Sequence, residues 1–341
     1  MPADTPKFKL LSWLTKQLTE KEQTGLISAF ATRFKVSRPF ASRTIKSFID
    51  EGWIAVTGSP KRPVYMIGQN RLIHQTYRRE AVEESIIWTQ DFAPYFSLPK
   101  HIDDIAYYGF TEIANNAHDH SDGRHVQIVM ALFHGKLHLF IDDDGIGIFK
   151  KIQQSLDLPD PRLSLLELSK GKFTTDADNH SGEGIFFTSK LFDFFDIESN
   201  GLRFHHEKQL DILIPAPYKH GTRVSMRIAL DSTKTIKQAF DEFASPESDY
   251  SFNKTIVPVR LASIGGENLI SRSQAKRLVA RFDGFKTVIL DFTGIDMIGQ
   301  AFSDEVFRVF ANSHPDVSLT AINTCDDVER MIKRVKRNSP L

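Results

Sequence analysis

The sequence contains little cysteine and no long hydrophobic run. Cys325 is the one cysteine among 341 residues, which excludes an intramolecular disulfide and fits a reducing compartment. No apolar run approaches the length that spans a membrane, and residues 1–16 mix charged and apolar side chains, unlike a signal peptide. Internal repeats and low-complexity tracts are also absent. We therefore expect a cytoplasmic protein without a membrane segment.

Net charge is absent too, but the charges are unevenly distributed. The chain has 43 Lys/Arg and 43 Asp/Glu, yet residues 1–70 carry eleven basic against five acidic residues, a charge of +6 that leaves −6 for the remainder. A composition of 41% hydrophobic and 25% charged residues is typical of a globular protein with an ample core. The length predicts two or three domains.

The basic segment predicts three helices and a β-hairpin. The helices are expected at residues 8–18, 26–34 and 41–50, and the strands at 53–56 and 64–67 around a turn at 58–63. Ser37 is a suitable N-cap for the third helix, Pro39 fits its first turn, and Gly52 ends it. We expect this helix to bury Ile45, Phe48 and Ile49. Residues 1–70 thus resemble a winged helix-turn-helix domain.

That resemblance implies a surface for duplex DNA. The second and third helices would direct four side chains toward a major groove: Arg38, Ser42, Arg43 and Lys46. Lys61 and Arg62 at the tip of the wing would reach phosphates or a minor groove. The alternative is a protein-docking module, a role that winged helices also serve. The local charge of +6 favours DNA.

Residues 71–100 form a predicted helical connector. Residues 71–88 are charged and periodic enough for a helix, and a segment with two prolines follows. A histidine kinase would need its phosphoacceptor helix here. His74 is followed by Gln75 and Thr76 and lacks an acidic neighbour, so we expect His74 to be a surface residue and do not expect histidine kinase activity.

The chain centres on residues 137–147, Leu-His-Leu-Phe-Ile-Asp-Asp-Asp-Gly-Ile-Gly. Alternating apolar residues predict a half-buried strand. It ends in three carboxylates and two glycines, and such glycines let a backbone approach a ligand closely. A carboxylate fixed at a strand end can accept a hydrogen bond from an exocyclic amine. A loop without a ligand is the alternative.

Three further segments accompany this strand. In a helix predicted at residues 102–121, Glu112 and Asn116 are four apart and share a side. An Asn oxygen can bind Mg²⁺, and a Glu can orient a water molecule. Gly182 and Gly184 open another helix, where free N–H groups and the helix dipole favour an anion. Residues 220–226 begin a strand with Thr222 near its start.

These four segments, in this order, resemble the ATP-binding module of gyrase, MutL and histidine kinases, the GHKL superfamily. Residues 112–117 are similar to its N box, 143–147 and 182–184 to its two glycine boxes, and 221–222 to its closing Gly-Thr; the match covers roughly residues 95–230. The resemblance implies that Asp143 binds the adenine amine, Asn116 binds Mg²⁺, and Glu112 is the catalytic residue that activates water. It adds further ATP contacts at Gly145, Gly147, Gly182, Gly184 and Thr222. In the lid between the glycine boxes, Lys172 or Lys170 would neutralise phosphate charge.

The fold expected for residues 101–232 is an α/β sandwich, an antiparallel sheet covered by helices on one face. Hairpins are predicted at residues 125–142 and 201–214, a strand at 223–228 and a helix at 163–170. Residues 233–251 are predicted to form a helix at 233–244 and a linker. The whole chain is thus a multidomain α+β protein.

The last ninety residues alternate strand and helix, as an α/β domain does. Residues 288–295 and 298–305 resemble a STAS-like domain of the DUF4325 type, and we assign it residues 252–341. Proteins with this fold include antagonists of anti-sigma kinases, which carry a phosphorylatable serine at a helix entry. This chain has Gly299, Gln300 and Ala301 there. Thr293 and Ser303 lie nearby, and we expect Ser303 to be an N-cap.

Three functions fit this sequence. The first is a cytoplasmic regulator in which Mg·ATP binding and slow hydrolysis control DNA binding, with the STAS-like domain as a relay. The second is a serine/threonine kinase acting on an antagonist protein, as anti-sigma factors do. The third is a scaffold that holds nucleotide without turnover. ATP and Mg²⁺ are the expected cofactors; duplex DNA, a regulatory protein or a second copy of the chain are the expected partners, and a membrane is not.

Overall fold

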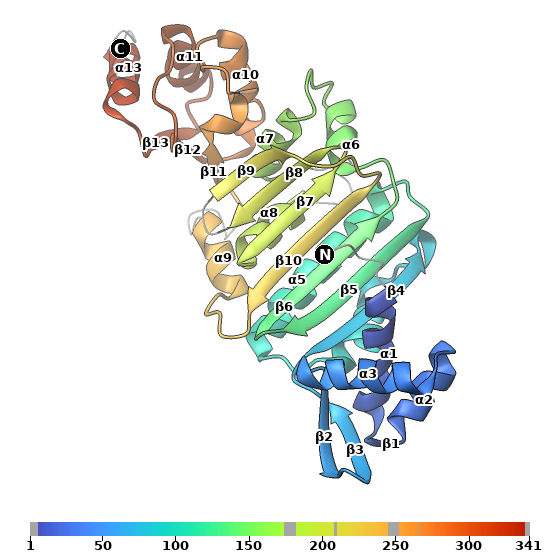
Figure 1. Ribbon diagram of the computed structural model, residues 1–341. Helices are drawn as coiled ribbons and strands as arrows, with labels where there is room; N and C mark the ends of the chain where they lie inside the picture. The colour runs from blue at the N-terminus through green and yellow to red at the C-terminus, as the bar shows by residue number, and fades with distance from the viewer. Residues whose placement is uncertain (1–5, 174–181, 208–209, 245–251, 265, 338–341) are drawn as a thin grey trace. The chain divides into compact units, whose positions relative to one another are not determined.

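A computed structural model describes residues 6–173, 182–207, 210–244, 252–264 and 266–337 (Figure 1). The described chain is a mixed α/β protein that divides into two compact units. The first contains residues up to 146 together with 192–198 and 219–233, and the second contains the remaining residues. Most of the predicted lid (174–181) and the predicted linker (245–251) lie outside the described residues. Among the described helices, none is long and apolar enough to cross a membrane.

The first unit begins with the three predicted helices and the predicted hairpin. These are α1 (Pro6–Glu20), α2 (Leu26–Phe34), α3 (Arg38–Asp50), β2 (Ile54–Ser59) and β3 (Arg62–Ile67), and a short β1 (Gln23–Thr24) gives the sheet order β1-β3-β2. Ser37 caps α3 as predicted, because its Oγ accepts a hydrogen bond from the Phe40 amide at 3.4 Å. Gly52 follows α3 with a φ of 77°, which a glycine adopts easily. Ile45 and Phe48 are buried, and Ile49 is half-buried.

The predicted helical connector is wrong for residues 71–78. They form the strand β4 (Arg71–Arg78), which pairs antiparallel with β5 (His125–Phe133). Its Leu72 and Ile73 are buried, and so is His74, which was expected on the surface. Contact with distant parts of the chain overrides the local helical pattern here. Only short helical segments follow, namely η1 (Arg79–Ala81), α4 (Glu84–Ile87), η2 (Trp88–Phe92) and η3 (Ala93–Tyr95).

Helix α1 covers the edge of the sheet that β4 forms. The Leu72 amide donates to Thr15 Oγ1 at 3.1 Å, and the His74 amide donates to Ser12 Oγ at 3.0 Å. Covering an edge strand in this way prevents it from pairing with another chain. Apolar side chains of α1, β4 and β5 share one core; they include Phe8, Leu11, Leu14, Leu18, Leu72, Val129 and Ala131. The N-terminal helices and the sheet are thus packed together.

The sheet of the first unit has the order β4-β5-β6-β10-β7, with β6 (Lys136–Asp143), β10 (Thr222–Ala229) and β7 (Phe194–Ser199). The pairs β5–β6 and β6–β10 are antiparallel, as predicted. Helix α5 (Lys100–His120) packs on one face through a buried stripe that includes Ala106, Phe110 and Ile113 (Figure 1). Gly109 of that stripe has no room for a side chain, because a Cβ would lie 2.5 Å from the Phe192 ring.

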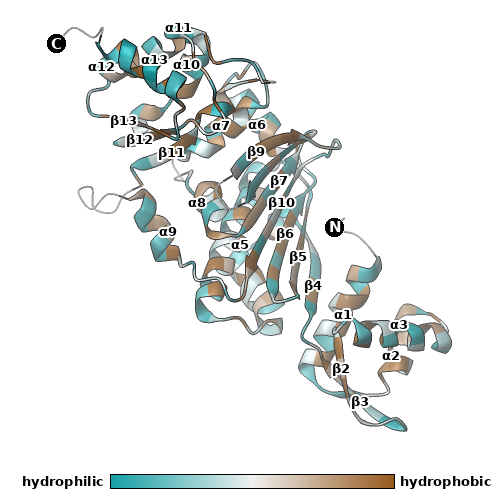
Figure 2. Ribbon diagram, turned by 60° about the vertical axis from the view of Figure 1, so that its left-hand side comes forward, coloured by the Kyte–Doolittle hydropathy of each residue, from teal (hydrophilic) through white to brown (hydrophobic). Residues whose placement is uncertain are grey.

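The second unit contains one group of helices with a hairpin, and a C-terminal α/β segment. The first group consists of α6 (Ile148–Ser155), α7 (Leu163–Lys170), α8 (Gly184–Leu191), β8 (Leu202–Glu207), β9 (Leu210–Pro215) and α9 (Ile236–Phe243). In the C-terminal segment, β11 (Lys254–Pro258), β12 (Thr287–Asp291) and β13 (Ser318–Ile322) form a parallel sheet in that order. Its helices are α10 (Arg272–Val279), α11 (Gln300–Asp304) with its continuations η7 (Glu305–Phe310) and α12 (Ala311–Ser313), and α13 (Asp326–Arg337). Hydrophilic residues predominate along α13 (Figure 2).

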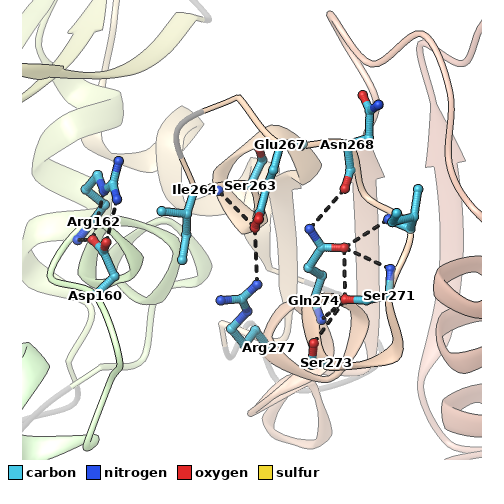
Figure 3. Close-up of polar contacts among 11 residues, drawn as sticks. Asp160, Arg162, Ser263, Ile264, Glu267, Asn268, Ser271, Ser273, Gln274 and Arg277 are labelled. Atoms are coloured by element: carbon cyan, nitrogen blue, oxygen red, sulfur yellow. Dashed lines mark hydrogen bonds and ion pairs between the residues drawn. The ribbon is translucent and has the colours of Figure 1, made fainter.

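Helix α10 begins with a capping box. Ser271 Oγ accepts a hydrogen bond from the Gln274 amide, and Gln274 Oε1 accepts one from the Ser271 amide at 2.8 Å (Figure 3). The same side chain donates to the Asn268 carbonyl, which fixes the approach to the helix. By contrast, Ser303 is not the predicted N-cap. Helix α11 begins three residues earlier with Gly299 as its N-cap, and Ser303 is fully buried inside it.

Candidate functional site

The three adjacent carboxylates at the end of β6 have different environments. Asp142 is buried and forms ion pairs with two cations from the start of β10 and the residues before it. Lys219 Nζ lies 2.5 Å from its Oδ1, and Arg223 Nε donates to its Oδ2 at 2.8 Å. A buried carboxylate with two cationic partners is well compensated. Asp142 therefore stabilises the pairing of β6 with β10.

Asp144 holds the turn between α5 and β5. Its Oδ1 accepts hydrogen bonds from the amides of Arg124 at 2.6 Å and His125 at 2.9 Å. Partial burial acts to raise the pKa of Asp144, but these amides lower it below its ordinary value. This carboxylate is about half exposed and has a structural role in the turn.

Asp143, between them, has backbone partners on one oxygen. Its Oδ1 accepts hydrogen bonds from the amides of Gly145 at 2.9 Å and Thr222 at 3.2 Å. Its Oδ2 accepts none from the part of the chain that the structure describes. Burial raises the pKa of Asp143 to about 6, although the two amides and Lys219 act to lower it. The result is a buried, fixed carboxylate with one oxygen that accepts no hydrogen bond from the described residues.

Two glycines permit this arrangement. At Gly221, where φ is 71°, a Cβ would lie 2.0 Å from the Asp143 carbonyl oxygen. At Gly145, a Cβ would lie 1.9 Å from the carbonyl oxygen of Ser121, at the end of α5. Any side chain at either position would displace the loop. The predicted site residues Gly145, Asp143 and Thr222 are thus brought together.

Glu112 and Asn116 lie on α5, one turn apart. Both side chains are half-buried, whereas Ile113 and Ala117 beside them are buried. The two polar side chains therefore border the buried stripe of the helix, as the spacing predicts. A carboxylate and an amide in this setting can orient water and bind a hard cation.

The second unit carries the other predicted glycines. Gly147 (φ 90°) is the N-cap of α6, and a Cβ there would lie 2.2 Å from Asn200 Oδ1, which accepts a hydrogen bond from the Lys150 amide. Packing against Asn200 thus requires a glycine at this position. Gly182 (φ 70°) contacts Phe173, whose amide donates to the Gly182 carbonyl at 3.2 Å.

The two lysines predicted to neutralise phosphate have other partners. Lys170 is fully buried, and its Nζ donates to Glu167 Oε1 at 2.7 Å and to the carbonyls of Arg277 and Ala280. Since an ammonium has three donors, all of them are used, and the phosphate role is wrong for Lys170. Lys172 is less buried, and its Nζ donates to the Gly284 carbonyl at 2.9 Å.

The predicted DNA-contacting side chains are all exposed. They are Arg38, Ser42, Arg43 and Lys46 on α3, with Lys61 in the two-residue turn of the hairpin and Arg62 at the start of β3. Sequence reasoning missed Phe40, which lies in the first turn of α3 and is 45% exposed. The sequence does contain a signal for it, because Phe40 is an aromatic residue in the first turn at a position that the helical period does not bury.

One comparison with known families identifies part of the chain. Residues 274–329 match the family model described as a STAS-like domain of unknown function (DUF4325). The match runs from α10 into α13 and includes β12 and β13, so this part of the C-terminal α/β segment is STAS-like. No curated protein matches the chain at a significant level.

Proposed function

We propose that this chain is a regulator in which a GHKL-type module binds and slowly hydrolyses Mg·ATP. That module would control a DNA-binding winged helix, with the STAS-like domain as a second regulatory part. The observation that carries the proposal is the difference between Asp143 and its neighbours. Asp142 and Asp144 stabilise the fold, whereas Asp143 is buried, has a raised pKa, and has one oxygen to which no described residue donates a hydrogen bond. Perturbed carboxylates of this kind are concentrated at functional sites.

The chemistry of this site suits adenine. The exocyclic amine of adenine donates hydrogen bonds, and a desolvated carboxylate is a strong acceptor for one of them. Asn116 would bind Mg²⁺, and Glu112 would orient the attacking water. The sequence resemblance assigns the phosphates to the glycines at the start of α8.

Replacement of Asp143 tests the binding part of the proposal. Asp143→Asn should weaken Mg·ATP binding by about 1–3 kcal/mol, because an amide replaces the charged acceptor. Calorimetry on the full-length protein measures this change, and Asp144→Asn is the matched control, since that carboxylate holds a turn. Equal affinities of wild type and Asp143→Asn would remove Asp143 from the adenine role.

Replacement of Glu112 tests hydrolysis. Glu112→Ala should lower turnover roughly 10²–10⁴-fold, the usual contribution of a general base, with little change in nucleotide affinity. Phosphate release is the readout, and Asp119→Ala near the end of the same helix is the control. A variant as active as wild type would contradict the assignment. Transfer of phosphate to a protein would instead favour the kinase alternative, and the absence of turnover in wild type would favour the scaffold.

A further inference from the structure

Lys172 is held in a cage built by the C-terminal segment. Its ammonium donates to the Gly284 carbonyl and lies 4.9 Å from the ring centre of Phe285 and 5.5 Å from that of Phe252. Aromatic faces attract a cation, and more strongly when it is desolvated. Burial accordingly lowers the pKa of Lys172, while nearby Glu183 acts to raise it.

The backbone around Lys172 is strained, and a residue of the C-terminal segment holds it through hydrogen bonds. Gly171 and Lys172 both have positive φ values, 79° and 52°, and the second is uncommon for a residue with a side chain. Arg281 Nη2 donates to both of their carbonyl oxygens, at 3.1 Å and 2.6 Å. Its Nη1 donates to the buried Glu167 at 2.8 Å. Strained residues persist where several contacts fix them, and such residues cluster at switches.

This caged lysine also lies close to the start of α8. Phe173, the next residue, makes the backbone hydrogen bond to Gly182 described above, and a Cβ on Gly182 would lie 2.5 Å from the Phe173 carbonyl. Lys172 and Glu183 are near enough to affect each other's pKa. The proposed phosphate-binding glycines and the caged ammonium are therefore neighbours within one unit.

We propose that the STAS-like domain restrains nucleotide binding by sequestering the Lys172 ammonium between Phe285, Phe252 and the Gly284 carbonyl. The inference rests on the proposed ATP binding and adds its regulation. The ammonium has two alternative partners, the cage and the phosphates of the nucleotide, and it cannot contact both. If nucleotide binds only molecules in which the ammonium has left the cage, its apparent affinity is its affinity for those molecules multiplied by the fraction of the protein that they represent. An event that opens the cage would strengthen nucleotide binding.

The test compares cage variants of the full-length protein. Phe285→Leu keeps an apolar side chain but removes the aromatic face, and the control is Phe310→Leu, which makes the same loss of volume at another buried phenylalanine of the same domain, one that packs on Phe282. Calorimetry with Mg·ATP and, separately, with inorganic tripolyphosphate measures affinity. Phe285→Leu should bind both about 3- to 30-fold more tightly than wild type, the range of one cation–aromatic contact. Phe310→Leu should match wild type.

A double variant assigns the effect to the lysine. Lys172→Met should weaken binding on the order of tenfold, and Phe285→Leu should produce no tightening on that background. Wild type that binds Mg·ATP, with unchanged affinity in Phe285→Leu, overturns the cage and leaves the proposed function standing. Absence of binding to both probes in every protein overturns both. If Phe285→Leu unfolds, Phe252→Leu removes the other aromatic wall and carries the same expectations.

Discussion

At the scale of single residues, the carboxylate of Asp143 lies where burial disfavours its ionised form. Its pKa of about 6 is higher than the value near 4 expected in the unfolded chain. The protonated side chain therefore contributes stability below about pH 4, and that contribution is lost as the pH rises to about 6. At neutral pH this residue lowers the free energy of unfolding, as expected of a group kept for a ligand.

Asp143→Asn should consequently stabilise the folded protein at pH 7 by about 2–3 kcal/mol, since asparagine can still accept from both amides without carrying charge. Urea denaturation at several pH values measures this. The advantage of the variant should grow between about pH 4 and pH 6 and then remain constant. The matched control, Asp144→Asn, should have the opposite sign at pH 7, because the pKa of Asp144 is lowered in the folded state. An Asp143→Asn variant less stable than wild type at pH 7 would show a structural role.

From the sequence, Asp143 is distinguished from the two adjacent carboxylates as the adenine-binding candidate only by the resemblance to the GHKL superfamily. The distinction between Asp142 and Asp143 depends on Lys219 and Arg223, which approach from residues about eighty positions later. Local pattern does not contain that information. The same holds for Lys170 and Lys172, whose partners Ala280 and Gly284 belong to the C-terminal segment.

At the scale of elements, strong local periodicity predicted helices and strands well. Helix α7 begins and ends at the predicted residues, and β5 and β6 form the hairpin predicted at residues 125–142. The prediction of a helix in place of β4 was wrong because β4 is held by α1, about sixty residues earlier in the chain. The prediction of Ser303 as an N-cap was wrong because α11 begins after Gly299, which has no side chain that could cap the helix and so mark its start in the sequence.

Helix α3 and the hairpin should act differently on DNA. Replacing Lys61 and Arg62 together with alanine should weaken binding similarly on all sequences and reduce the salt dependence by about one unit of slope for each phosphate that these side chains neutralise. Arg43→Ala, if Arg43 reads a base, should cost about 1–3 kcal/mol and relax preference at one position. Binding isotherms of the full-length protein over a salt series, on sites selected from random duplexes, separate these effects. Lys150→Ala, exposed in the second unit, is the control.

Failure of the full-length protein to bind duplex DNA at low salt would instead identify residues 1–70 as a protein-docking module. The full chain is needed because the helical core continues into Leu72, Val129 and Ala131. A fragment that ends at residue 70 would expose the apolar face of α1. A negative result from the fragment would therefore say nothing about DNA.

At the scale of the molecule, the first unit joins the proposed DNA-binding and adenine-binding parts through one core. Trp53, which precedes β2, stacks on Phe133 at the end of β5, with ring centres 5.5 Å apart and planes 9° apart. Strand β5 pairs along its length with β6, which ends in Asp143. A change in β6 on nucleotide binding could thus reach the β2–β3 hairpin through the pairing of β6 with β5 and the contact between Phe133 and Trp53. Coupling requires that ATP bind two arrangements of this unit with different affinity.

Phe133→Leu should weaken that coupling while leaving each site intact. In wild type we expect Mg·ATP to change the affinity for DNA by about 5- to 150-fold, the usual range of allosteric coupling, and DNA to change ATP affinity by the same factor. Loss of the stack, worth about 0.5–1.5 kcal/mol, should bring both factors toward one. Isotherms for each partner with and without the other measure the factors, and Phe34→Leu, which disturbs an aromatic cluster inside the helical part, is the control. Equal factors in wild type and Phe133→Leu would show that the signal does not pass through this contact.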